Sequence, residues 1–142
     1  MRSSASRHMS SASSVDLRGP QPLLLVADRV NARLQYFTLD GRHHSFVGGM
    51  NLPCHFSERR GEFVIPDLGA RVALMDRDNK VITHLGDDSA AKTFWDLRKQ
   101  TRDHFTPGKF VCPHGACFDH EGNILVVEWA EVGRVSRLRK VG

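Results

Sequence analysis

Residues 123–128 read NILVVE and residues 134–138 read RVSRL, with a turn of five residues between them. The pattern is an apolar strand that ends in an acidic residue, a short turn, and a second strand that begins with Arg. It occurs twice earlier in the chain, as LLLVAD and RLQYF at residues 23–28 and 33–37, and as EFVIPD and RVALM at residues 62–67 and 71–75. The chain is therefore built from repeats.

The repeats recur with a period of about 40 residues, which is typical of propeller blades that cannot bury a core alone. Asp28 and Asp67 lie 39 positions apart, whereas Asp67 and Glu128 lie 61 apart. A polar segment between Gly86 and Phe110 accounts for the difference. The sequence therefore predicts an all-β fold made of β-propeller blades, with an insertion at about residues 87–108.

The predicted strands make about two and a half blades, whereas a propeller closes its ring with about four to eight blades of four strands. They cover residues 23–27, 33–39 and 44–47 in the first unit, 55–57, 62–66, 71–76 and 80–85 in the second, and 115–119, 123–128 and 134–140 in the third. We therefore interpret residues 23–142 as a partial propeller. Either the chain is the C-terminal part of a longer propeller, or several copies associate, or it folds poorly, and the first explanation is favoured.

Residues 1–22 are rich in Ser, Ala and Arg and end in GPQP. Such a composition cannot bury enough apolar surface to order itself, so it predicts a disordered leader over residues 1–22. No apolar core follows Arg2 and Arg7, so no secretory signal is visible. No apolar run reaches the roughly 20 residues of a transmembrane helix, and no membrane partner is expected.

The basic side chains argue against a nucleic-acid partner. The formal net charge is only +4, and the densest cluster is Arg134, Arg137, Arg139 and Lys140. Cations at alternating strand positions are typical of a solvated outer strand. No aromatic residues alternate with them, as binding of single-stranded nucleic acid would require. RNA binding is therefore the least favoured function.

The repeated acid and Arg form the end of one strand and the start of the next. A charge-assisted pair that braces each hairpin is the simplest interpretation. A structural brace must recur in every blade, whereas a catalytic pair need not. We therefore predict a structural role for these residues.

Two histidines stand out because both are expected to begin the innermost strands of consecutive units, at equivalent places in neighbouring repeats. His55 lies in LPCHF at residues 52–56, and His114 lies in CPHGACFD at residues 112–119. Innermost strands border the central channel of a propeller, where imidazoles from different blades can converge on a metal. His55 and His114 are therefore candidate zinc ligands, and a catalytic zinc would need a third. The alternative is that each caps its strand and bonds backbone or water.

Residues 113–128, PHGACFDHEGNILVVE, resemble an NHL-type repeat, and ADRVNARL at residues 27–34 resembles a signature of the same family. The resemblance covers about residues 23–141 and includes uncharacterised bacterial NHL propellers. A His that opens an inner strand is similar to the arrangement in the lyase domain of peptidylglycine α-amidating enzymes. That resemblance implies a six-bladed ring and a secreted or periplasmic location.

The lyase resemblance also implies a chemistry. In that domain three histidines hold zinc, and an Arg and a Tyr beside the metal help to cleave a peptidyl-α-hydroxyglycine to an amidated peptide and glyoxylate. His55 and His114 match ligand positions. Tyr36 lies in a strand and matches no catalytic position, and the sequence assigns no Arg to the catalytic role.

The sequence therefore supports two functions. The first is a fragment of a metal-dependent lyase- or hydrolase-like propeller, with zinc as the candidate cofactor. The alternative is a non-catalytic binding module for a peptide, protein or carbohydrate. Both are compatible with a small-molecule or peptide ligand and with a homo-oligomer.

Overall fold

The computed structural model describes residues 12–91 and 93–141. Over these residues the chain forms three antiparallel sheets, in which each strand pairs with the next one along the sequence. The first sheet contains β1 (Ser13–Asp16), β2 (Leu23–Asp28), β3 (Arg33–Phe37) and β4 (His43–Val47). The second contains β5 (Ser57–Arg59), β6 (Glu62–Asp67), β7 (Arg71–Met75) and β8 (Val81–Leu85). The third contains β9 (Pro113–Phe118), β10 (Ile124–Glu128) and β11 (Arg134–Leu138).

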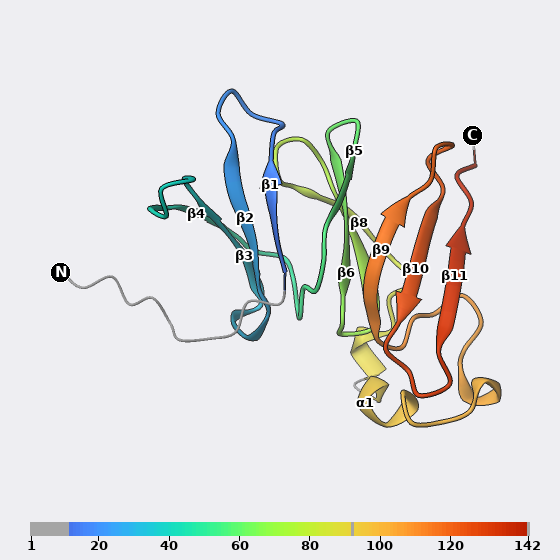
Figure 1. Cartoon of the computed structure of the whole chain (residues 1–142). Coiled ribbons are helices and arrows are strands. Elements are labelled where there is room, and N and C mark those ends of the chain that lie inside the picture. The colour runs from blue at the N-terminus through green and yellow to red at the C-terminus, as the bar shows by residue number, and fades with distance from the viewer. Residues whose placement is uncertain (1–11, 92, 142) are drawn as a thin grey trace.

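Figure 1 shows the three sheets side by side in chain order, from the blue first sheet to the orange and red third sheet. Alternation of side chains along the strands explains this stacking, because successive residues point to opposite faces. In β6, Phe63 and Ile65 pack against the first sheet, and Val64 packs against the third. The second sheet is thus covered on both faces. The all-β prediction of propeller blades is confirmed.

The structure differs from the sequence-based expectation at β1. Residues 13–16 fall within the predicted leader, yet they pair in register with β2. The strand carries little apolar surface of its own, so its order comes from this backbone pairing and from the contacts of Arg18. Residues 1–11 of the predicted leader lie outside the described residues.

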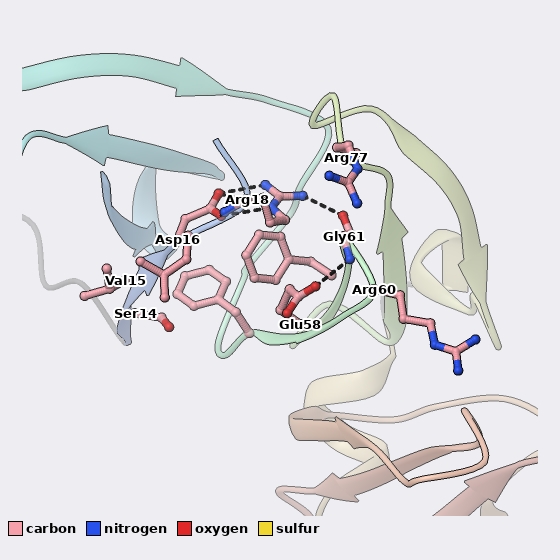
Figure 2. Close-up of a pocket in the computed structure, with 11 residues that line it drawn as sticks. Ser14, Val15, Asp16, Arg18, Glu58, Arg60, Gly61 and Arg77 are labelled. Carbon is pink, nitrogen blue, oxygen red and sulfur yellow. Dashed lines mark hydrogen bonds and ion pairs between the residues drawn. The ribbon is translucent and has the colours of Figure 1, made fainter. Parts of the chain in front are cut away.

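Arg18 connects the first sheet to the second. Its side chain is only 7% exposed and forms an ion pair with Asp16 at 2.8 Å. Figure 2 shows the guanidinium between Asp16 and the carbonyl of Gly61, to which Nη1 donates at 3.1 Å. The guanidinium also lies 4.0 Å over the ring of Phe63. Its further acceptors are the Tyr36 hydroxyl at 3.0 Å, the Asn79 side-chain oxygen at 2.6 Å and the Asp76 carbonyl at 2.9 Å.

The segment between β8 and β9 has no strand among its described residues. It contains the 3-10 turn η2 (Ser89–Ala91), the short helix α1 (Phe94–Leu97) and the 3-10 turn η3 (Arg102–His104). Figure 1 shows α1 at the lower edge of the second and third sheets. The segment packs there on a small apolar cluster that includes Cys54, Leu68 and Cys112. None of the helices in the described part of the chain has the length and apolar character needed to span a bilayer.

Candidate functional site

The candidate site lies at the edge where the second strand of each sheet ends. A carboxylate–arginine pair closes each sheet at this edge, as the repeat predicts. Asp28 pairs with Arg33 at 2.8 Å, Asp67 pairs with Arg71 at 3.0 Å, and Glu128 pairs with Arg134. The carboxylate side chains are 4%, 0% and 0% exposed, respectively.

Two of these carboxylates also hold the chain segment that enters their sheet. Asp67 accepts hydrogen bonds from the backbone N–H of Asn51 at 2.7 Å and of Leu52. Glu128 accepts one from the backbone N–H of Val111 at 2.6 Å. Each buried charge therefore has both a cation and backbone donors as partners, which is what burial of a carboxylate requires. These pairs are structural.

The residue that follows the carboxylate reaches the centre of this edge. In the first sheet it is Arg29, which begins the 3-10 turn η1 (Arg29–Asn31). Its Nη2 lies 3.4 Å from Nε2 of His114, which is the second residue of β9 in the third sheet. The edge therefore brings side chains from the first and third sheets into contact. Arg29 was not among the site residues that the sequence predicted.

His55 lies near the same pair, but its place in the sheet is not equivalent to that of His114. Pro53 pairs with Asp67 and Pro113 pairs with Glu128, so the position equivalent to His114 is Cys54. His55 also precedes β5 by two residues rather than opening the strand. The expected equivalence of the two histidines is therefore wrong by one residue. Both side chains are nevertheless exposed, and the charge of His55 acts on His114.

The surroundings of His114 favour its neutral form. Partial burial of the ring lowers its pKa from the ordinary value of 6.5, and the charges of Arg29 and His55 lower it further. A neutral imidazole has one unprotonated nitrogen, and at Nε2 this nitrogen accepts from Nη2 of Arg29. His114 is thus able to ligate a metal or accept a proton at neutral pH.

Arg29 has an unusual feature for a half-buried cation. Its Nε is buried and has no hydrogen-bond partner among the described residues. Nearly all buried N–H groups in proteins have a partner, so this unpaired donor is an exception. Its charge also acts on the Cys54 thiol, although burial dominates there and raises the thiol pKa to about 11.

An aromatic group borders the histidines. Trp129 follows Glu128, so it occupies in the third sheet the position that Arg29 occupies in the first. It is 48% exposed, and its ring centroid lies 6.5 Å from that of His114. The Arg98 guanidinium, from the inserted segment, lies 3.7 Å from the centroid of the Trp129 ring. The Trp95 ring contacts the Trp129 ring edge-on, with 6.3 Å between the ring centroids. The shared position after the carboxylate is the signal that could have identified both Arg29 and Trp129.

The donors at this edge do not by themselves complete a zinc site. Two imidazoles are suitable donors, but they are fewer than the three protein ligands of a catalytic zinc. Residues 12–91 and 93–141 contain no group of three or more His, Cys, Asp and Glu side chains that could hold a metal. Burial raises the thiol pKa of Cys54 and of Cys112 to about 11, so both thiols stay protonated at neutral pH. A third ligand would therefore have to come from another blade.

Tyr36 is not part of the candidate site. Its hydroxyl donates to Asp16 at 2.8 Å and accepts from Arg18 at 3.0 Å in the interface between the first two sheets. Burial and the nearby Asp16 carboxylate raise its pKa far above the ordinary value. The side chain is a core residue.

No protein-family model and no curated protein sequence matches the chain. Among solved structures, the chain is similar to virginiamycin B lyase from Staphylococcus aureus, which has a propeller-type fold, with a TM-score of 0.52 and 11% sequence identity. The match covers 93% of this chain and 42% of that one, so the chain spans less than half the length of this neighbour. Identity this low supports the β-propeller-like fold and nothing finer. The resemblance to NHL repeats stays a prediction.

Proposed function

We propose that the chain contributes to a metal site in a lyase- or hydrolase-like propeller, with His55 and His114 as two of its imidazole ligands. The observation that supports this most strongly is the approach of Arg29 and His114 at 3.4 Å, with His55 close enough for its charge to affect His114. Three polar side chains from three sheets thus converge on one edge. Convergence of this kind is what a channel site in a propeller requires.

The residues have separate roles in this proposal. His55 and His114 would hold zinc, which when bound supplies a Lewis acid and lowers the pKa of a bound water. The lowered pKa of His114 keeps its nitrogen unprotonated, as a ligand must be. Arg29 would hold an anionic group of the substrate, such as a carboxylate, through the positive charge of its guanidinium. Trp129 lies beside the His114 imidazole, and Arg98 covers one face of the Trp129 ring.

A non-catalytic binding module is the second candidate, and the exposed tryptophans favour it. Trp95 and Trp129 are 43% and 48% exposed, and the Arg98 guanidinium already covers one face of Trp129. Aromatic faces beside cations bind peptides and sugars without any metal. Under this alternative, replacement of both histidines would leave ligand binding intact.

The test is a calorimetric titration of the full chain with Zn²⁺. We expect His55→Ala and His114→Ala each to weaken the zinc affinity by about tenfold or more, because each removes a ligand. His120→Ala is the matched control, since His120 is an exposed histidine in the turn after β9. Equal affinity in His114→Ala and His120→Ala would contradict the proposal.

A further inference from the structure

The free face of the third sheet carries apolar side chains at positions that are buried in the other two sheets. In each sheet, one residue of the third strand of the repeat pairs with the residue just before the carboxylate. These residues are Leu34, Val72 and Val135, so they occupy equivalent positions. Leu34 and Val72 are 0% exposed because the next sheet covers them, whereas Val135 is 71% exposed. The residue just before the carboxylate shows the same difference in exposure. Ala27 in the first sheet is 0% exposed, whereas Val127 in the third sheet is 48% exposed.

The opposite face of the first sheet shows the complementary pattern. By the same register, Val26 is equivalent to Ile65 and Val126. Both of these residues are 0% exposed, because the preceding sheet covers them. Val26 itself is partly exposed, as is Leu24, whose equivalent Phe63 is buried. The first sheet therefore carries a face suited to a preceding sheet, and the third sheet carries a face suited to a following one.

We propose that a second copy of this chain covers both faces. The third sheet of each copy would pack on the first sheet of the other, which repeats the packing already present between consecutive sheets within the chain. Two copies with three described sheets each supply six sheets, within the range of about four to eight blades that close a propeller. The same contact is made twice about a twofold axis, so the assembly closes and leaves no free face.

The second copy would also complete the candidate site, and this part of the inference rests on the proposed function. With a twofold axis along the channel, the edge that carries the candidate site lies at the same end of the ring in both copies. His55 and His114 of each copy would then lie at the same end of the ring as their counterparts. The four imidazoles supply the third ligand that the described residues of one chain lack.

The test is the solution mass of the full chain by light scattering. We expect a species of about twice the 15.9 kDa chain mass. Val135→Asp is expected to raise the dissociation constant by about 100-fold or more, because a carboxylate would be buried without a partner. Val135 is largely exposed within one chain, so the variant is expected to keep its circular dichroism spectrum. Ile82→Asp is the matched control, since Ile82 is 53% exposed on β8, away from both faces, and we expect it to leave the dimer intact.

Three results would overturn the inference: a monomer for the unaltered chain, a closed species of another size, or a dimer that Val135→Asp does not weaken. Zinc titration separates this inference from the proposed function. A dimer that binds no zinc would contradict the proposed function alone. A monomer whose zinc affinity depends on His114 would contradict the dimer alone.

Discussion

Asp67 illustrates what a single buried charge does in this fold. Its side chain is fully buried, and its oxygens accept from Arg71 and from two backbone N–H groups of the segment that enters the second sheet. The repeat made this pair predictable, because the same two residue types recur at the same strand ends in three units. Repetition marks the position that follows each carboxylate, but it does not predict which of the residues at that position reaches the site. Arg29, Leu68 and Trp129 differ in chemistry, and only the three-dimensional edge shows that Arg29 reaches His114.

The pKa of His114 provides a test at the scale of one residue. We expect Arg29→Gln to raise this pKa toward the ordinary value of 6.5, because the variant removes a nearby positive charge. The folded protein binds this proton less tightly than the unfolded chain does. The free energy of unfolding is therefore expected to fall as the pH drops through about 6.5, and to level off below the folded-state pKa.

Titration of the imidazole signals by NMR would measure this shift. Arg42→Gln is the control, because Arg42 is largely exposed and pairs with Asp40 rather than with a histidine. An unchanged His114 pKa in Arg29→Gln would show that Arg29 does not act on the imidazole.

At the scale of elements, β1 is the strand that composition missed. Strand prediction relies on alternating apolar residues, and those patterns were sufficient for the central strands of all three sheets. β1 instead depends on Arg18, whose partners Gly61 and Asn79 lie 43 and 61 positions away. Local sequence contains no information about partners at that distance. The one-residue offset between the sheet positions of His55 and His114 has a similar origin. Register is set by pairing with the neighbouring strand, and the order of residues within a motif does not determine it.

Arg18→Ala tests how much β1 depends on this one side chain. We expect a loss of about 3–5 kcal/mol in the free energy of unfolding, because the change leaves the Asp16 carboxylate and two carbonyls without their donor. Arg42→Ala, which breaks an exposed ion pair, is expected to cost less than about 1 kcal/mol. Urea unfolding of both variants would measure the difference. Equal losses would show that the Arg18 contacts do not support the strand.

At the scale of the whole molecule, the sheets form a linear array whose apolar packing joins neighbouring sheets, while Arg29 and His114 link the first sheet to the third at one edge. The hydrophobic clusters reflect this order, since one lies between the first and second sheets and another between the second and third. The period of the repeat was enough to predict such an array and its propeller-like stacking. Which face of each end sheet stays uncovered could not be predicted, because it depends on the side of that sheet on which its neighbour packs.

The position of the second sheet has a consequence for local unfolding. Its central strands β6 and β7 are covered on both sides, whereas the first and third sheets are covered on one side only. Amide hydrogen exchange in a single chain should therefore be slowest at Val64, Ile65, Val72 and Ala73, which are all fully buried. The end sheets should exchange faster in the Val135→Asp variant than in the unaltered chain, because their outer faces would stay open to solvent. Uniform exchange across all three sheets in that variant would mean that the array opens as one cooperative unit rather than from its ends.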